Sequence, residues 1–376
     1  MNSIWTRRAL LGAVAAAGAL ARPEVQAGPT IPFGPDKSIS VGFGIRASYA
    51  SVEDGAPDGK SRSSDFNLDS ARLYFGASLS KNIKGMLNTE WDGEQIRVLD
   101  AAGQFAISPE LNIWAGRLLA PSDRANMAGP YYSLGGGYWA GVASRYGYNG
   151  GIFRGRDDGV TVWGNVLGGK LGYSIGAFEG YTFGVGSLTQ GQARAAGIAT
   201  ADHVMVAGRL QYDFWDAEPG YYGTGNYLGS KDILAIGVAA RQQKNGVLTL
   251  AAKGDYSSYN VDFLLEKKLP GAGAFSLEAA YYDYNTDGVI RSEQGKAYSA
   301  GAAYVFDQAM GWGKLQPFVR YQRFSADTNI DTRQVDAGVN YIIDGYNAQL
   351  SAVYSVAKVT ANPDKSRFVV ALQLQY

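Results

Sequence analysis

The feature that most limits the fold of this chain is a regular alternation of apolar and polar residues along most of its length. It is clearest in segment 366–376, where one face consists of Phe368, Val370, Leu372, Leu374 and Tyr376. The opposite face carries Arg367, Gln373 and Gln375. A period of two residues is typical of a β-strand whose two faces meet different surroundings. A helical membrane bundle is excluded, because it needs apolar runs of about 20 residues.

The alternation delimits sixteen strands, and the lengths of their connections alternate as well. We expect strands at 38–50, 68–80, 83–92, 95–107, 111–119, 158–166, 170–180, 203–215, 231–242, 257–268, 273–285, 296–306, 315–325, 332–343, 347–358 and 366–376. Short connections fall on one side of the count, at 108–110, 167–170, 269–273 and 344–346. Longer polar connections fall on the other side, at 51–67, 120–157, 181–202, 243–256 and 359–365. Connection 216–230 is an exception to this alternation, because it is long although its neighbours on the same side of the count are short.

Residues 1–27 have the pattern of a secretory signal peptide. Arg7 and Arg8 precede the apolar segment 9–20, and residues 25–27 (VQA) resemble a cleavage site. The alternative is a membrane-anchoring helix, but the apolar segment is too short to span a bilayer comfortably. We therefore expect this segment to be removed on export.

Short turns at one end of the strands and long loops at the other are typical of bacterial outer-membrane barrels. In such a barrel one strand face meets lipid and the other meets a polar lumen, and closure satisfies the backbone hydrogen bonds. A soluble β-sandwich also alternates, but it does not explain the signal, the even strand count and the C-terminal aromatic together. The predicted fold is all-β: a transmembrane antiparallel β-barrel of sixteen strands, in a single domain spanning 28–376.

The composition leaves little for catalysis or for nucleic-acid binding. The chain has no cysteine, which excludes thiol catalysis, disulfide bonds and cysteine-ligated metals. His203 is the only histidine, and on a strand it would point away from its neighbour Asp202, so the two cannot form a catalytic pair. The 34 basic and 34 acidic residues balance, so there is no basic field to collect nucleic acid. We predict that the protein is not an enzyme and uses no cofactor or metal.

Several longer segments occur in an order that matches a known family. They are FNLDSARLYFGASLSKNIKGMLNTEWD, VLDAAGQFAISPELNIWAGRLLAPSDR, FRGRDDGVTVWGNVLGGKLGYSIGAFEGY, QPFVRYQRF, VDAGVNYIIDGYNAQLSAVY and the terminal LQLQY. In this order the chain resembles the phosphate-selective porin O/P family of outer-membrane channels. The resemblance covers most of the chain after residue 27. It implies a 16-stranded, homotrimeric porin whose long third external loop folds into the lumen.

Segment 120–157 is the candidate for that loop. With both chain ends in the periplasm it is the third external connection, and it is the longest. A long loop without periodicity is usually functional or disordered, and the alternative here is a floppy surface loop. Aromatic and basic residues in a loop folded into the pore would form a narrow, partly apolar constriction. The residues assigned to it are Arg124, Tyr131, Tyr132, Arg145, Arg154 and Arg156.

Strand parity also assigns charged residues to the lumen. The basic ones are Arg46, Arg72, Lys84, Arg209, Arg241, Arg320 and Arg367. The acidic ones are Glu90, Asp92, Asp213, Asp262, Glu266, Glu278 and Asp336. Arginine is a good anion ligand because its planar group donates several hydrogen bonds. The alternative for each arginine is a salt bridge within the lumen.

These features predict an outer-membrane porin that lets small hydrophilic solutes diffuse passively. Its partners would be outer-membrane lipid and the solutes or anions themselves. The mixed lining leaves two alternatives open, a modest preference for anions such as phosphate and a nearly unselective pore. A different function remains as an alternative: a structural or receptor barrel that binds a partner through its external loops.

Overall fold

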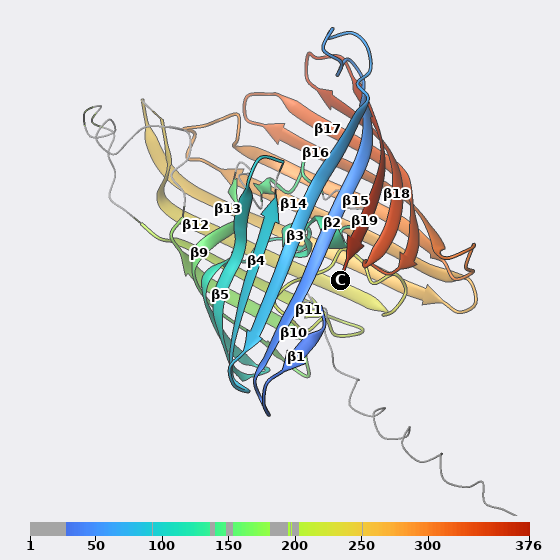
Figure 1. The fold of residues 1–376 in the computed structure, drawn as a ribbon. Helices are drawn as coiled ribbons and strands as arrows, with labels where there is room; N and C mark the ends of the chain where they lie inside the picture. The colour runs from blue at the N-terminus through green and yellow to red at the C-terminus, as the bar shows by residue number, and fades with distance from the viewer. Residues whose placement is uncertain are drawn as a thin grey trace, which may run out of the picture.

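The computed structural model describes residues 28–91, 93–135, 140–147, 153–180, 195, 197, 203–249 and 251–376, without the side chains of 147, 153 and 154. Within this part, one sheet contains the short strand β1 (Thr30–Pro32) and sixteen strands that close into an antiparallel ring (Figure 1). Each ring strand pairs with its neighbours in the sequence, and β19 pairs with β2 to close the ring. The predicted closed, sixteen-stranded, all-β fold is confirmed. The predicted signal segment 1–27 lies outside the described residues.

The sixteen strands coincide with the predicted segments to within a few residues, except where two strands extend further. The first eight are β2 (Ser38–Val52), β3 (Asp65–Ser78), β4 (Ile83–Trp91), β5 (Ile96–Ser108), β6 (Leu111–Leu119), β9 (Arg156–Val166), β10 (Leu171–Phe178) and β11 (Met205–Asp213). The others are β12 (Ile233–Leu248), β13 (Lys253–Leu269), β14 (Gly273–Asn285), β15 (Gly295–Phe306), β16 (Lys314–Ala326), β17 (Asp331–Asp344), β18 (Ala348–Val359) and β19 (Lys365–Gln375).

One predicted loop is wrong. Segment 243–256 is not a long loop, because β12 and β13 continue through it as a paired hairpin. The ladder is irregular between Gln243 and Val247, and it resumes with Val247 opposite Gly254. The polar residues that suggested a loop therefore belong to the far end of a hairpin.

The alternation of the strands separates an apolar outer surface from a polar interior. On β2, Ile39, Val41, Phe43 and Ile45 are exposed on the outside of the ring. Arg46 and Ser48, of the opposite parity, are buried. An apolar outer face with a polar inner face is the arrangement of a barrel that stands in lipid. In the described part of the chain, no helix is long and apolar enough to cross a membrane.

The two ends of the barrel differ in their connections. We call one end the short-turn end, which carries the connections 79–82, 109–110, 167–170, 270–272, 307–313 and 345–347. Glycine permits the left-handed backbone that tight turns need, as at Gly168 (φ +68°) and Gly271 (φ +72°). The opposite, long-loop end carries connection 120–155, which contains helix α1 (Arg124–Ala128), the 3₁₀ turn η1 (Pro130–Tyr132) and the paired strands β7 (Tyr146–Gly147) and β8 (Phe153–Arg154).

Candidate pore constriction

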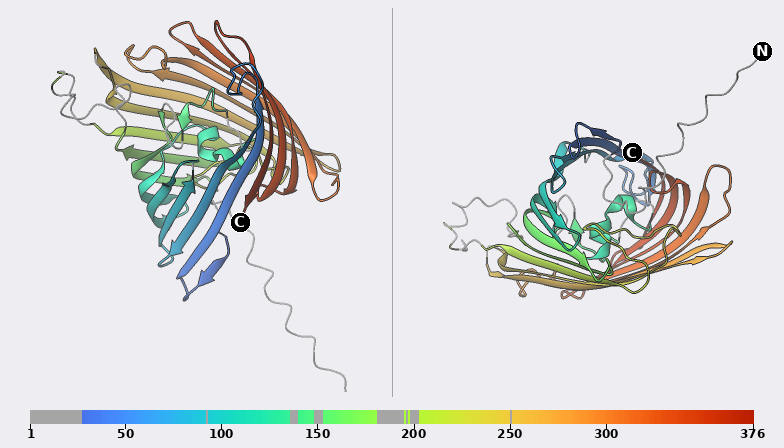
Figure 2. Two further views of the ribbon diagram at one scale, coloured as in Figure 1. Left: turned by 45° about the horizontal axis from the view of Figure 1, so that its top comes forward. Right: turned by 90° about the horizontal axis from the view of Figure 1, so that it is seen from below.

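Segment 120–135 is hydrogen-bonded to strands from several sides of the ring. Arg241 on β12 donates from Nε to the Pro121 carbonyl at 3.0 Å. Asn340 on β17 donates to the Leu134 carbonyl at 3.1 Å, and Gln373 on β19 donates to the Tyr131 carbonyl at 3.0 Å. In the end-on view of Figure 2, helix α1 is seen within the ring of strands. These contacts connect the segment to widely separated parts of the barrel wall.

Helix α1 is short and is held by its own cap. The Asp123 carboxylate accepts from the backbone N–H groups of Ala125 and Asn126, at 3.1 and 3.3 Å. A carboxylate at this position satisfies backbone donors that a helix start leaves free. The helix ends at Gly129, whose φ of +67° suits glycine. Asp123 also accepts from the Tyr282 hydroxyl at 2.8 Å, so the same side chain attaches the helix to β14.

Arg124 is buried in ion pairs. Its guanidinium lies 2.8 Å from the carboxylate of Glu218, and its Nη1 donates to the Thr224 carbonyl at 3.0 Å. Its backbone N–H donates to the Asp262 carboxylate at 3.1 Å. Only 5% of the side chain is exposed. The charge of Arg124 is therefore largely neutralised by its neighbours, which weakens its action on a distant ion.

Tyr131 and Tyr132 lie on the opposite side of the same segment, against β3 and β19. The Tyr131 hydroxyl is 3.0 Å from the hydroxyl of Ser70, and the guanidinium of Arg72 lies 4.6 Å from the Tyr131 ring centre. A cation over an aromatic face is attracted by the ring quadrupole. The Tyr132 ring packs at 5.2 Å against that of Tyr346, from the turn between β17 and β18.

The other three predicted constriction residues are spread along connection 120–155 and the start of β9. Arg156 donates from Nε to Asp100 on β5 at 2.8 Å. Arg145 pairs with Glu293, and its guanidinium lies 3.9 Å from the Phe324 ring centre. Arg154 belongs to β8, and its side chain is outside the described part of the structure. Arg156 is thus close to the wall of β5, whereas Arg145 lies against connection 286–294 and β16.

The seven basic residues assigned to the lumen lie on the inward parity of their strands. Arg72 pairs with Glu90 at 2.8 Å, Arg209 with Asp262 at 2.5 Å, and Arg320 with Asp336 at 3.0 Å. Arg46 lies 5.6 Å from the Tyr131 ring centre, and Arg241 reaches the carbonyl of Pro121.

Arg367 is half-buried and lies opposite Ser355 of β18, whose hydroxyl bonds to Asp336. The seventh, Lys84, lines the cavity described next. Of the acidic residues, Asp92 lies outside the described residues.

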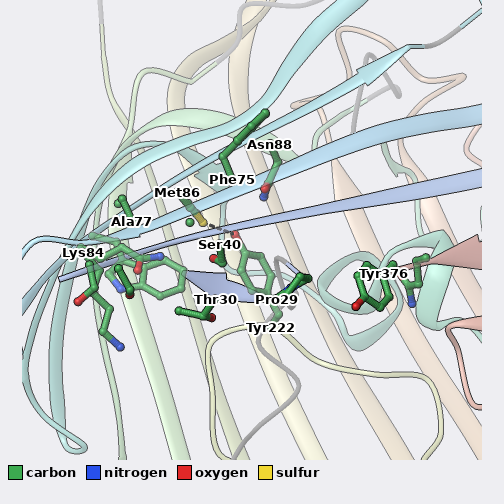
Figure 3. Close-up of a pocket in the computed structure, with 18 of the residues that line it drawn as sticks. Pro29, Thr30, Ser40, Phe75, Ala77, Lys84, Met86, Asn88, Tyr222 and Tyr376 are labelled. Atoms are coloured by element: carbon green, nitrogen blue, oxygen red, sulfur yellow. Dashed lines mark hydrogen bonds between the residues drawn. The ribbon is translucent and has the colours of Figure 1, made fainter. Parts of the chain in front are cut away.

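A cavity of about 910 Å³ opens at the short-turn end, along the inner faces of β2 to β6 (Figure 3). Its lining includes Lys84, Met86, Asn88, Tyr132 and Tyr222. A second cavity, of about 30 Å³, lies further along the wall and is lined by Arg72, Tyr74, Met127, Arg156 and again by Tyr132 and Tyr222. Tyr132 and Tyr222 therefore line both cavities.

The connection between β11 and β12, residues 214–232, also contributes to this region, and sequence reasoning did not assign it. Tyr222, Glu218 and Thr224 all belong to it. The sequence did show that this connection is unusually long for the end of the barrel that carries the short turns. Nothing in the sequence indicated that it folds into the barrel.

The single histidine, His203, lies just before β11. The carbonyl of His203 accepts from the Gln243 side chain at 3.1 Å. Asp202 lies outside the described residues. Among the residues that the structure describes, no group of three or more His, Cys, Asp or Glu side chains is arranged to hold a metal ion.

Comparisons with known proteins identify the fold. No family model matches the chain, and no curated protein matches it. The anion-selective porin from Comamonas acidovorans has a TM-score of 0.59 at 12% identity, with 91% of this chain and 100% of the porin covered. OprB of Pseudomonas putida has a TM-score of 0.60 at 10% identity, covering 90% and 94%. The trimer form of Vibrio cholerae OmpT has a TM-score of 0.57 at 13% identity, covering 91% and 100%. The chain therefore has the fold of the multi-pass β-barrel porins of the bacterial outer membrane.

Proposed function

We propose that the protein is an outer-membrane porin, a water-filled channel for passive diffusion of small hydrophilic solutes. The observation that carries the proposal is the cavity of about 910 Å³ along the inner faces of β2 to β6, together with the smaller cavity that shares Tyr132 and Tyr222 with it, inside a closed barrel with an apolar outer surface. Solute passage along such a route depends on its width and on the charge of its lining. Segment 120–157 would be the third external loop, and its described part would narrow this route.

We propose a weak anion preference and no dedicated phosphate site. The guanidinium groups nearest the smaller cavity, those of Arg72 and Arg156, are each paired with a carboxylate, Glu90 and Asp100. Paired charges largely cancel beyond a few ångströms, so a passing ion meets a modest net field. The Comamonas acidovorans porin of similar fold is anion-selective, which is compatible with this proposal.

The test is a single-channel recording in a planar lipid bilayer, with the reversal potential measured under a potassium chloride gradient and under a potassium phosphate gradient. We expect stepwise conductance, a small anion-directed potential in chloride, and no saturation at low phosphate concentration. A folded barrel that inserts without conductance would instead support the alternative, a structural or receptor barrel. Saturation by phosphate would support the phosphate-selective family named from the sequence.

Two further parts of the proposal concern the mature protein. We propose that residues 1–27 are removed on export, so N-terminal sequencing of the outer-membrane protein should begin at Gly28. We also propose a homotrimer, because Vibrio cholerae OmpT, which has a similar fold, has a trimer form. Mass determination of the detergent-extracted protein would test it, and a monomeric mass would contradict it.

A further inference from the structure

The β11–β12 connection, residues 214–232, bends inward from the short-turn end. Its base is closed by a hydrogen bond from the Asp216 N–H to the Asp232 carbonyl at 3.0 Å. Further along, the Glu266 carboxylate of β13 accepts from the N–H groups of Tyr227 and Gly229, at 2.7 and 2.5 Å. The Asn226 carbonyl accepts from the Tyr346 hydroxyl at 2.9 Å, so the connection is attached to the wall on two sides.

The tip of this connection meets the segment that enters from the long-loop end. The Gly225 N–H donates to the Tyr132 carbonyl at 2.8 Å, and the Gly223 N–H donates to the Met127 carbonyl at 3.3 Å. The buried ion pair between Arg124 and Glu218 joins the same two segments. Backbone hydrogen bonds and a buried ion pair together fix the relative position of two loops that come from opposite ends of the barrel.

Tyr222 is shared by three cavities inside the barrel. It lines the 910 Å³ cavity, the 30 Å³ cavity, and a third cavity of about 50 Å³ beside β9 to β11. Its ring lies 5.9 Å from that of Trp114, and its hydroxyl lies 3.8 Å from the Met86 sulfur on β4 (Figure 3). The side chain therefore extends from the connection to the part of the wall formed by β4 and β6.

We propose that the β11–β12 connection is a second, fixed constricting element, and that Tyr222 sets the width of the solute route. In this arrangement the two connections divide the lumen, and solutes pass between Tyr132, Tyr222 and the wall of β3 to β5. The proposal rests on the proposed channel function, because width matters only if solutes pass.

The first experiment compares single-channel conductance of the wild type with two tyrosine variants. Tyr222→Ala should raise the conductance roughly twofold or more, since the narrowest part of a channel dominates its resistance. Tyr227→Ala is the matched control: the same substitution in the same connection, at a residue that lines only the third cavity. We expect its conductance to equal that of the wild type. If Tyr222→Ala does not insert, Met86→Ala removes the wall side of the same contact and should also raise the conductance.

The second experiment tests whether the contact is fixed. A Cβ atom on Gly223 would lie 3.7 Å from the Cβ of Met127, within the range of about 3.5–4.5 Å found in disulfides. The chain has no cysteine, so in Gly223→Cys/Met127→Cys this is the one disulfide that can form. We expect it to form on oxidation and to leave the conductance equal to that of the reduced variant.

The outcomes separate the inference from the proposed function. No conductance in the wild type would contradict the channel itself. If the wild type conducts, an unchanged conductance in Tyr222→Ala and Met86→Ala would overturn the proposed route. A rise in Tyr227→Ala as large as that in Tyr222→Ala would overturn it as well. Failure of the disulfide to form, or a loss of conductance when it forms, would overturn the fixed contact between the two segments.

Discussion

The guanidinium of Arg124 and the carboxylate of Glu218 lie 2.8 Å apart, although their segments enter the barrel from opposite ends. Both side chains are almost fully buried, with 5% and 4% exposed. Removing one partner of a buried ion pair leaves a charge without compensation, which typically costs about 3–5 kcal/mol. We expect Arg124→Ala to lower the free energy of unfolding by about this amount.

Thermal unfolding in detergent, followed by circular dichroism, measures the effect. Lys314→Ala is the control, because the pair of Lys314 and Asp307 is about half exposed and such pairs contribute about 0–1 kcal/mol. The double variant Arg124→Ala/Glu218→Ala should lose less stability than the sum of the two single variants. Equal losses for Arg124→Ala and Lys314→Ala would show that the pair does not join the two segments.

The second prediction concerns Arg156 and Asp100, whose side chains pair at 2.8 Å beside the smaller cavity. Arg156→Ala leaves the Asp100 carboxylate uncompensated, so the ratio of anion to cation permeability should fall. Asp100→Asn removes the negative charge of the pair and should raise the same permeability ratio. Both shifts in reversal potential should be larger at 10 mM salt than at 1 M, where screening acts over about 3 Å.

Lys358→Ala is the control, because it removes one positive charge, as Arg156→Ala does, at an exposed position. Lys358 and Asp364 form an exposed pair near the connection between β18 and β19, and both are more than half exposed. Its removal should leave the reversal potential unchanged. A shift in Lys358→Ala as large as in Arg156→Ala would indicate that the total charge, and not its position, determines selectivity.

The third prediction concerns Tyr376, the last residue. Its backbone exchanges two hydrogen bonds with Phe43, at 2.8 and 2.9 Å, and 65% of the residue is exposed. An exposed aromatic at a strand end suits the membrane interface. We expect Tyr376→Ser to reduce the yield of inserted barrel, measured by the heat-modifiable shift on gels, whereas Tyr376→Phe keeps it. Equal yields for the two variants would contradict this role.

The fourth prediction is a pH dependence at the long-loop end of the ring closure. Glu53, just after β2, accepts from the N–H and hydroxyl of Ser366 at 2.9 and 2.7 Å. These hydrogen bonds hold the pKa of Glu53 below its usual 4.5. Since the folded pKa is lowered, the contact is fully present above pH 4.5 and is lost as the pH falls through the lowered value.

Amide hydrogen exchange at Ser366 measures this loss. After correction for the intrinsic pH dependence of exchange, protection at Ser366 should be constant well above pH 4.5 and should fall as the pH drops through the lowered pKa of Glu53. The variant Glu53→Gln has no titrating group at this position. The protection of its Ser366 amide should therefore not vary over the same pH range. A fall of equal size in Glu53→Gln would assign the effect to another group.

The strands were predictable from the sequence because lipid and lumen impose opposite demands on neighbouring residues. Ile45 and Arg46 illustrate this, since one is exposed on the outer face and the other is buried within the ring. Parity alone therefore placed the arginines on the inner face. Parity could not give their partners, because Arg209, for example, pairs with a carboxylate 53 residues further along the chain.

The inward path of the β11–β12 connection was not predictable for a similar reason. It depends on Glu266 of β13 and on Tyr346, which are close to the connection only after the ring has closed. The hairpin of β12 and β13 was underestimated because the alternation weakens near Asn245, which has a left-handed backbone (φ +53°). Local pattern identifies strands, whereas contacts between distant segments determine the lumen.

The pairing of β19 with β2 has a consequence for how the chain folds. The seam joins residues that are far apart in the sequence, such as Glu53 and Ser366, which are separated by 313 positions. Until β19 is in place, residues 44–52 of β2 lack their partner strand on one edge, and an unpaired edge readily recruits other strands. Pairing between strands so far apart in the sequence is also slow, because the entropic cost of closing a large loop comes before the stabilising contacts form. The chain must therefore be protected from aggregation until its last strand, the eleven-residue β19 (Lys365–Gln375), pairs with β2.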